Sequence, residues 1–320
     1  MGLAIIGQGL AGCCLAWQLE WLNADFTVYD EPRPVAASRI AAGMINPVTG
    51  KNYTLGWRFS ESLAEAVGFY RRVEGILGAS FWHPMPVIRL VSEKEWKKVA
   101  PKLSDPELSP WLEGVEVFSE GPWKAAITLR GGGRVAVRDF CEATREHMRS
   151  NGRFSPPSDL SRRVHCEGAA GLITGQLGPH RSAQGEILTV RANWPQDRIT
   201  VGGGGWLVPV GNSLFKAGST YVWDRLDGEI SPAGLSRVRE IISELAGPDF
   251  EVVAQEAGVR PIVRRSQPVI GNMPDGRIVF NGLGSKGSLY APSAAANLAG
   301  WLVNDAALDP GLDAKFLHSS

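Results

Sequence analysis

The chain has 320 residues, of which 44% are hydrophobic and 21% charged. This is the composition of a globular protein, and the length leaves room for about two domains. Lysine and arginine together number 33, as do aspartate and glutamate, so no broad electrostatic surface for nucleic acid is expected. No run of about 18 uninterrupted apolar residues occurs, so no membrane-spanning helix is expected.

Cysteine usage and the first residues favour a cytoplasmic protein without a metal site. The four cysteines form neither a C-x-x-C pair nor a metal-ligand spacing, as is typical of a reducing compartment: Cys13, Cys14, Cys141 and Cys166. The first positively charged side chain is Arg33, so the basic segment of a secretory signal is missing.

A dinucleotide-binding pattern opens the chain. Residues 3–6 (LAII) predict a buried parallel strand, and the glycine-rich turn GQGLAG at 7–12 follows directly. An apolar helix is predicted from Cys13 to about Leu22, and a second strand at 26–30 ends in a carboxylate. This order and spacing are typical of a nucleotide-binding strand–helix–strand unit.

The residues of this unit have distinct expected roles. Gly7 allows the tight turn, Gly9 lets a pyrophosphate approach the backbone, and Gly12 lets the helix pack closely on the strand. The free N–H groups at the helix start favour phosphate. Asp30 can accept hydrogen bonds from both hydroxyls of an adenosine ribose. The pattern by itself does not distinguish FAD from NAD.

The rest of the chain mixes helices with antiparallel strands. Helices are predicted at 62–77, 139–149, 235–245 and 292–304, and strands at 86–91, 164–166, 186–192, 205–210, 214–222 and 277–280. Ser62 and Glu65 have the spacing of a capping box at the start of the first of these helices. The glycine-rich segment 281–288 precedes the last helix, and it is either a second anion-facing helix N-terminus or a plain turn.

Several further motifs, taken in order, resemble the D-amino-acid-oxidase-like (DAO) family of flavoproteins, and the pattern is closest to its glycine oxidases. The segments that carry this resemblance, besides 7–12 and Asp30, are Ala41-Ala42-Gly43-Met44, Gly205-Trp206-Leu207-Val208-Pro209, Ala217-Gly218-Ser219-Thr220, Gly258-Val259-Arg260-Pro261, Pro268-Val269-Ile270-Gly271 and Gly282 through Pro292. The resemblance spans nearly the whole chain and implies FAD as the cofactor. The cofactor-binding candidates are then Gly7, Gly9, Leu10, Ala11, Gly12, Asp30, Glu31, Ala37, Ser38, Ala42, Gly43, Met44, Gly284, Ser285, Lys286, Gly287 and Ser288.

Three residues are the candidates for the catalytic pocket. Arg260 can hold a substrate carboxylate by two parallel hydrogen bonds, and the alternative is a strand arginine paired with an acid. Trp206 and Tyr221 either wall the pocket or belong to the core. Lys286 and the N–H groups of 284–288 either stabilise negative charge on the reduced flavin or form a solvated turn.

Two departures from the family pattern leave the substrate open. The stretch between Gly152 and Val164 is shorter than the family's β-rich segment, which contacts the adenine side of the cofactor. Trp206 stands where the glycine oxidases have a tyrosine whose hydroxyl helps to hold the substrate carboxylate. An indole donates one N–H, with a different reach from that of a phenol.

The resemblance implies an α+β protein in which a Rossmann-like FAD-binding domain is interleaved with an antiparallel β-sheet substrate domain. The expected boundaries are 1–50, 122–185 and 262–320 for the first, and 51–121 and 186–261 for the second. The implied activity is that of an FAD-dependent amine or amino-acid oxidase or dehydrogenase, with hydride transfer to flavin and hydrolysis of the imine. Its expected partner is a small-molecule amine or amino acid, not a membrane or nucleic acid.

Two alternatives remain open at this point. The same family includes a tRNA-modifying oxidase that acts on a carboxymethyl-amino group of a wobble uridine, although the balanced charge counts against that function. The other alternative is a catalytically decayed FAD-binding scaffold protein, which the tryptophan at position 206 and the shortened segment keep open.

Overall fold

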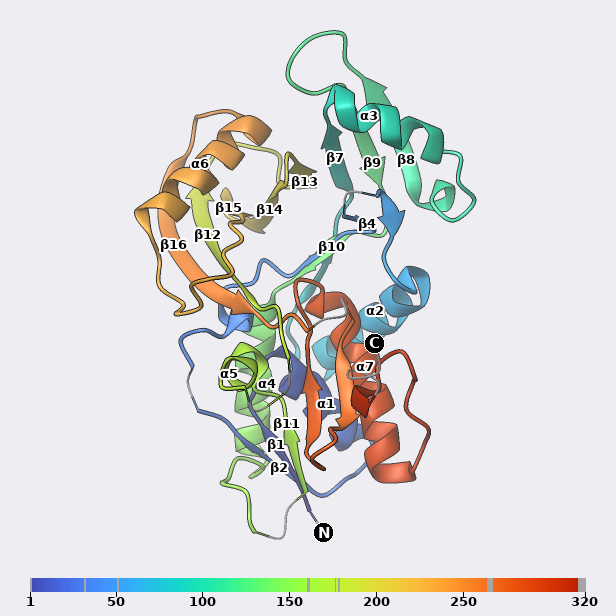
Figure 1. Ribbon diagram of the computed structural model, residues 1–320, viewed down its shortest axis with the longest axis vertical. Helices are drawn as coiled ribbons and strands as arrows, with labels where there is room; N and C mark the ends of the chain where they lie inside the picture. The colour runs from blue at the N-terminus through green and yellow to red at the C-terminus, as the bar shows by residue number, and fades with distance from the viewer. Residues whose placement is uncertain are drawn as a thin grey trace.

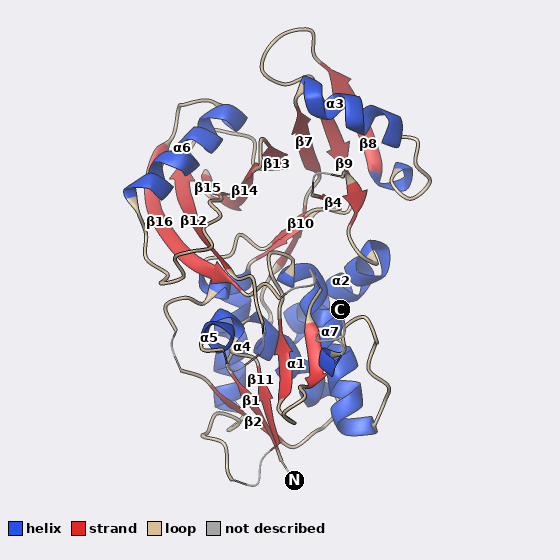
Figure 2. Cartoon of the chain, viewed as in Figure 1, coloured by secondary structure: helices blue, strands red, loops and turns tan. Residues whose placement is uncertain are grey.

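The computed structural model describes residues 2–31, 33–50, 52–159, 162–175, 177, 179–263 and 267–315. The molecule is elongated, with a small sheet among several helices at one end and a large sheet with two helices at the other (Figures 1 and 2). The sequence-based fold class is confirmed, because the chain is an α+β protein in which a nucleotide-binding unit joins a largely antiparallel sheet.

The smaller sheet has five strands in the order β17–β18–β11–β1–β2. Their bounds are β1 (Leu3–Ile6), β2 (Phe26–Tyr29), β11 (Arg162–His165), β17 (Val269–Asn272) and β18 (Ile278–Asn281). All neighbours are parallel except β17 and β18. Ile5 of the central strand β1 pairs with Val28 on one side and Val164 on the other. The turns that follow the parallel strands therefore meet at one edge, where ligands of such sheets bind.

Four helices share an apolar core with this sheet. They are α1 (Leu10–Trp21), α2 (Phe59–Leu77), α4 (Val137–Ser150) and α7 (Gly287–Asn304). Helix α1 is apolar and buried from Leu10 to Trp17, whereas Gln18, Glu20 and Trp21 near its end are partly exposed. The fully buried Trp17 donates to the Thr144 hydroxyl of α4 at 2.9 Å. In the part of the chain that the structure describes, no helix combines the length and hydropathy needed to cross a membrane.

The larger sheet has eight strands in the order β16–β12–β15–β14–β13–β7–β9–β8. Their bounds are β7 (Val87–Val91), β8 (Leu112–Val117), β9 (Ala125–Leu129), β12 (Ala183–Arg191), β13 (Ile199–Gly202), β14 (Gly205–Gly211), β15 (Leu214–Gly218) and β16 (Glu251–Arg260). All neighbours are antiparallel except β7 and β13. Helix α6 (Pro232–Ala246) lies on the β12–β15 part, and α3 (Glu93–Val99) lies on the β7–β8 part (Figure 1).

Short elements connect the two sheets. A three-stranded sheet is made of β3 (Met44–Ile45), β10 (Gly133–Val135) and β6 (Trp82–Pro84), and a two-stranded sheet is made of β4 (Val48–Thr49) and β5 (Thr54–Leu55). The remaining helices are α5 (Gly168–Ile173) and the 3₁₀ helices η1 (Ala37–Arg39), η2 (Ala100–Lys102) and η3 (Ser109–Trp111).

Two elements bear on where the domain boundary is drawn. Helix α2 packs in the core of α1 and α7, although its residues were placed in the substrate domain by the sequence. Strand β9 lies within 122–185 and is part of the larger sheet. We therefore propose a division in which α2 belongs to the FAD-binding domain and β9 to the substrate domain.

All five predicted helices begin earlier in the structure than predicted, by two to five residues, and two of these differences have structural consequences. Helix α2 begins at Phe59, so Ser62 lies inside it and the capping box predicted there does not form. Helix α7 begins at Gly287, and Pro292, the predicted start, lies inside the helix. A proline cannot donate to the carbonyl four residues before it. That carbonyl, of Ser288, instead accepts a hydrogen bond from the Tyr70 hydroxyl at 3.1 Å, so the early start leaves no buried acceptor unpaired there.

The short segment after α4 extends the edge of the smaller sheet. Phe154 forms a parallel bridge with Val28 of β2, and the Val28 N–H donates to the Arg153 carbonyl at 2.7 Å. Among the described residues between Gly152 and the start of β11 at Arg162, this bridge stands where the family pattern has a longer β-rich stretch.

Candidate functional site

A cavity of about 810 Å³ lies where the carboxyl edge of the smaller sheet meets the larger one. It is lined by the turn after β1, the end of β2, the segment 35–46, the start of α7 and strands β12, β14 and β16. Every site residue predicted from the sequence lines this cavity except Gly12. The structure therefore brings together candidates that lie more than two hundred residues apart in the chain (roughly two-thirds of its length).

The turn after β1 is formed by close backbone contacts. Gly7 has a φ of +99°, which favours glycine. A Cβ at Gly12 would lie 2.0 Å from the Gly7 carbonyl oxygen, so Gly12 serves the packing of α1 on the turn. Gly9 precedes α1, whose first turn has no acidic residue and no side-chain cap. The Leu10 N–H donates to the Ser38 hydroxyl at 3.4 Å, and the following N–H groups of that turn are the ones available to an anion.

Gln8 is the clearest sign that this turn holds a polar ligand. Its side chain is 3% exposed, and it lines the cavity. Neither its amide oxygen nor its amide nitrogen has a hydrogen-bond partner among the described residues. A buried amide without partners is costly, so a polar ligand in the cavity would relieve that cost.

Asp30 is held by protein groups on both of its carboxylate oxygens. Oδ1 accepts from the Gln8 N–H at 2.8 Å, and Oδ2 pairs with Arg145 of α4. A carboxylate oxygen has more than one lone pair, so these bonds leave room for ribose hydroxyls. The contact of Asp30 with a ribose stays a prediction. The neighbouring Glu31 accepts from the Tyr29 hydroxyl at 2.6 Å.

The segment that leads into β3 is fixed from both domains. Gly43 has a φ of +69°, and a Cβ there would lie 1.8 Å from the Val135 carbonyl oxygen. The Lys216 ammonium of β15 donates to the Ile40 carbonyl at 2.6 Å. Arg138 of α4 donates in the same way to the Arg39 carbonyl, also at 2.6 Å. Main-chain atoms of this segment are therefore held against the cavity wall.

The start of α7 forms another wall of the cavity. Gly282 and Gly284 both have positive φ, and α7 then begins at Gly287 without a side-chain cap. Lys286 precedes the first turn and lines the cavity, and burial lowers the pKa of its ammonium group. The predicted turn 284–288 therefore presents a cation to the cavity, whereas the N–H groups of Gly284 and Lys286 donate to the carbonyls of Pro261 and Leu283 at 2.9 and 3.1 Å.

Arg260, at the end of β16, is the central cation of the substrate side. Its guanidinium donates to the Ser219 hydroxyl at 2.6 Å and to the Thr220 carbonyl at 3.3 Å, and it lies 4.0 Å from the centre of the Tyr221 ring. It lies over Gly185, where a Cβ would be 2.2 Å from Nη2. Burial lowers the pKa of this group, and no described carboxylate pairs with it. It therefore retains N–H donors for an anionic ligand.

Trp206 lies on β14 beside this arginine. Its backbone pairs with Gly218 of β15, and a Cβ at Gly218 would lie 3.1 Å from the indole ring. The indole is partly buried and lines the cavity, as does the more exposed Tyr221. The structure thus places both aromatic candidates at the wall of the cavity, and their roles in catalysis stay predictions.

Three cavity residues with evident structural roles were missed by the sequence reasoning. They are Arg145, which holds Asp30, Gly185, which makes room for Arg260, and Ser219, which accepts from Arg260. Gly185 lies just before the predicted strand 186–192, so its place inside β12 was not apparent from the sequence. The contacts of Arg145 with Asp30 and of Ser219 with Arg260 each join residues more than forty positions apart in the chain. No local sequence pattern reveals such contacts. In the described chain, no group of histidine, cysteine and acidic residues could hold a metal ion.

This combination of a glycine turn, two uncapped helix starts and a buried arginine defines a nucleotide-cofactor enzyme of the flavoprotein type. The chain belongs to the DAO family, described as FAD dependent oxidoreductase, whose sequence model matches residues 3–155 and 160–301. The family prediction is confirmed, and so is FAD as the cofactor.

Curated relatives of the chain include two proteins named tRNA 5-methylaminomethyl-2-thiouridine biosynthesis bifunctional protein MnmC. The one from Caulobacter vibrioides is 24% identical over 94% of this chain and 54% of its own length. The one from Methylibium petroleiphilum is 24% identical over 93% of this chain and 56% of its own length. The chain therefore spans about half the length of the curated relatives it matches.

Solved structures confirm the fold. Glycine oxidase from Geobacillus kaustophilus superposes with a TM-score of 0.78 at 20% identity, covering 96% of each chain. Iminodiacetate oxidase from Chelativorans sp. BNC1 gives a TM-score of 0.77 at 19% identity, covering 96% of this chain and 97% of its own.

The residues of the cavity fit FAD. The unpartnered Gln8 amide and the uncapped start of α1 suit the pyrophosphate, and the glycine-lined turns leave space for a backbone approach. The cation and N–H groups at 284–288 suit the electron-rich edge of a reduced flavin. Both sets of donors line one cavity, and the two helix starts lie close together, since a Cβ at Gly287 would be 3.0 Å from the Leu10 side chain.

Proposed function

We propose that this protein oxidises the C–N bond of an amine that carries a carboxylate, such as an amino acid. The observation that carries this proposal is Arg260, whose partly buried guanidinium lines the cavity and has no carboxylate partner among the described residues. A buried cation is costly without an anion, so an acidic ligand fits the site. Proteins of the same fold named glycine oxidase and iminodiacetate oxidase support this choice of substrate.

The residues of the chain divide the work between binding and orientation. FAD, when bound, supplies a ring that accepts a hydride from the carbon next to the amine, and water then hydrolyses the imine product. Arg260 fixes the substrate carboxylate and thereby the direction of the reacting C–H bond. Trp206 and Tyr221 wall the pocket, and Lys286 would hold positive charge beside the flavin.

The first experiment is an anaerobic screen of amines and amino acids, read as loss of the flavin absorbance. The purified protein is expected to be yellow, to release FAD on denaturation, and to bleach with at least one acidic amine. Stable yellow colour with every compound would favour the catalytically decayed scaffold protein instead.

The second experiment tests the role of Arg260 by rapid-mixing reduction. Arg260→Lys keeps the charge and loses the two-point fork, so reduction by the acidic substrate should slow severalfold or more while FAD content stays at the parent level. Arg260→Met should slow it further. The control is the decarboxylated amine, which both variants should affect far less, and equal losses on both substrates would show that Arg260 is only structural.

A second candidate function is the oxidation of an amine carried on a tRNA base. The curated relatives named for tRNA 5-methylaminomethyl-2-thiouridine biosynthesis favour it, because they match more than nine-tenths of this chain. The equal numbers of basic and acidic residues count against it. The test is to mix the yellow protein anaerobically with tRNA that carries a carboxymethyl-amino uridine. Bleaching by this tRNA and by no free amino acid would replace the first proposal.

A further inference from the structure

The segment 219–231, between β15 and α6, carries an aromatic pair at the mouth of the cavity. Tyr221 lines the cavity and is 45% exposed. Trp223 is 59% exposed, and its ring centre lies 5.8 Å from that of Tyr221 with the planes tilted by 33°. Large aromatic side chains exposed beside a binding cavity are candidates for contact with the ligand.

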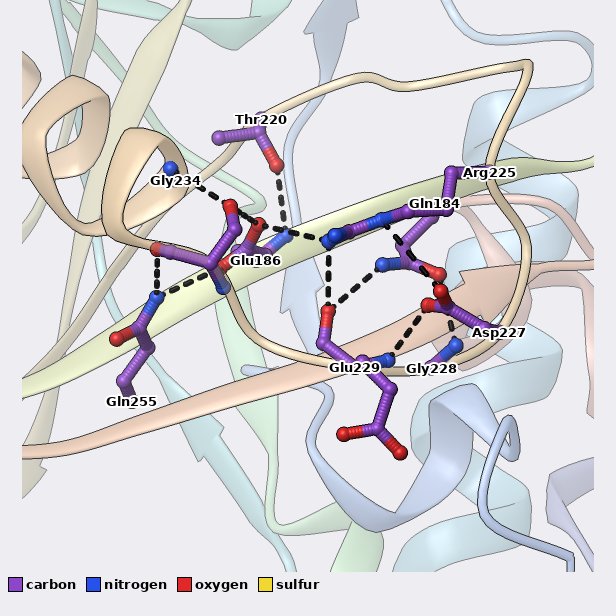
Figure 3. Close-up of polar contacts among 10 residues, drawn as sticks. Gln184, Glu186, Thr220, Arg225, Asp227, Gly228, Glu229, Gly234 and Gln255 are labelled. Atoms are coloured by element: carbon purple, nitrogen blue, oxygen red, sulfur yellow. Dashed lines mark hydrogen bonds and ion pairs between the residues drawn. The ribbon is translucent and has the colours of Figure 1, made fainter.

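This segment is fixed to the sheet by Gln184 of β12 (Figure 3). The Gln184 side chain donates to the Glu229 carbonyl at 2.9 Å and accepts from the Gly228 N–H at 2.8 Å. Its backbone exchanges two hydrogen bonds with Val222, at 2.8 and 3.0 Å. Main-chain atoms on both sides of Trp223 are therefore tied to the same strand.

Glu186, two residues further along β12, fixes the other end of the segment. Its carboxylate is 2% exposed and accepts from the Ser231 N–H at 2.9 Å, the Ser231 hydroxyl at 2.6 Å and the Gln255 amide at 2.6 Å. Arg225 lies 3.7 Å away as an ion-pair partner. The carboxylate sits so close under the first turn of α6 that a Cβ at Gly234 would lie 2.2 Å from it. A buried carboxylate with this many donors holds its surroundings in one geometry.

The aromatic pair and the carboxylate-binding arginine form one unit. Arg260 donates to Ser219 and Thr220, the first two residues of the segment, and its guanidinium stacks on Tyr221. Tyr221 therefore lines the cavity directly beside Arg260. Trp223 does not line the cavity itself, but its more exposed ring lies next to that of Tyr221.

We propose that Tyr221 and Trp223 form a second subsite, which holds a planar aromatic substituent of the substrate while Arg260 holds its carboxylate. This inference rests on the proposed function and narrows its substrate class to amino acids with an aromatic group near the amine. Because Gln184 and Glu186 already hold the main chain of the segment that carries the rings, binding a planar group does not require that main chain to be ordered first.

The test compares three N-substituted glycines on the FAD-loaded protein under anaerobic conditions: N-benzylglycine, N-cyclohexylmethylglycine and N-methylglycine. Calorimetry gives the affinity of each, and the cyclohexyl compound separates stacking of a planar ring from burial of apolar surface. N-Benzylglycine is expected to bind on the order of tenfold more tightly than the other two, as ring stacking predicts. Equal affinity for the benzyl and cyclohexylmethyl compounds overturns the proposal.

Variants locate the effect on the segment. Trp223→Ala should bring the ratio of benzyl to methyl affinity close to one, and Trp223→Phe should keep most of it because a planar ring remains. The matched control is Ile230→Ala, since Ile230 is 52% exposed on the same segment and lies outside the cavity lining. A ratio unchanged in Trp223→Ala, or lost equally in Ile230→Ala, overturns the subsite. Binding decides the subsite and bleaching of the flavin decides the proposed function, so the two failures are distinguishable.

Discussion

The two ends of the cavity are built in different ways. At the end assigned to the dinucleotide, glycines bring main-chain atoms together, as in the 2.0 Å approach that excludes a Cβ at Gly12. At the substrate end, side chains from β12, β16 and the segment 219–231 hold one another, with Arg260 and Glu186 at the centre. Main-chain sites are encoded by short local patterns, whereas side-chain sites depend on contacts between distant strands. The dinucleotide end can therefore serve any protein that binds the same cofactor, whereas the substrate end can change with the substrate.

The largest expected effect is at the dinucleotide end. Gly12→Ala puts a Cβ against the Gly7 carbonyl, and neither backbone segment can move without disturbing β1 or α1. We expect a loss of about 3 kcal/mol in unfolding free energy, the upper range for overpacking, together with loss of bound FAD. Chemical denaturation and the absorbance of the purified protein measure the two effects.

A glycine in open space is the control for this substitution. Gly75 lies inside α2 and is exposed, and no neighbouring atom lies within 4 Å of the position that a Cβ would take there. Gly75→Ala should therefore raise stability by about 0.5–1 kcal/mol without changing FAD content. If Gly12→Ala behaves like Gly75→Ala, the close approach at the turn does not determine cofactor binding. The dinucleotide end would then not depend on main-chain contacts, and the contrast between the two ends would be contradicted.

A smaller effect is expected at the substrate end. Gly185→Ala places a Cβ 2.2 Å from the Nη2 of Arg260, but the atom in the way is the tip of a flexible side chain and can move. The fold and the FAD content should survive, while the displaced guanidinium loses its contacts with Ser219 and Tyr221. Affinity for the acidic substrate should fall on the order of tenfold, the loss of one charged hydrogen bond.

Calorimetry with the acid and its decarboxylated analogue measures that loss. The analogue should bind as it does to the parent protein, because it makes no use of the arginine. A loss of FAD from Gly185→Ala would contradict the separation of the two ends, since it would show that the arginine also supports the cofactor.

The contrast explains how much could be predicted from the sequence. The strand at 3–6, the glycine turn and the second strand follow from local pattern and chain order, and the structure has β1 and β2 there. The start of α7 at Gly287 could not be predicted, because the proline at 292 is tolerated only through the distant Tyr70 hydroxyl. The partners of Asp30 and Arg260 could not be predicted for the same reason. Arg145 becomes a neighbour of Asp30, and Ser219 a neighbour of Arg260, only in the folded chain.

The last prediction concerns a side-chain contact outside both ends. Glu74 of α2 is 8% exposed and accepts from the Phe81 N–H at 2.6 Å, the Trp82 N–H at 2.7 Å and Arg71 at 2.8 Å. Burial by itself raises the pKa of this carboxyl, but the hydrogen bonds from Trp82, Phe81 and Arg71 outweigh it, so the pKa lies below the ordinary value of 4.5. The charged form therefore stabilises the turn that leads into β6.

The sign of the pH dependence follows from that lowered pKa. A carboxyl with a lower pKa in the folded state adds stability that is fully present above pH 4.5 and is lost as the pH falls through the folded-state value. Glu74→Gln should lower the unfolding free energy by about 1.5 kcal/mol at pH 7, and the difference from the parent should shrink at pH values below about 4. Urea unfolding at both pH values measures it. Because Glu74 does not line the cavity, FAD content and substrate affinity at pH 7 should stay at the parent level. A change in either would mean that contacts far from the cavity also determine how its two ends bind their ligands.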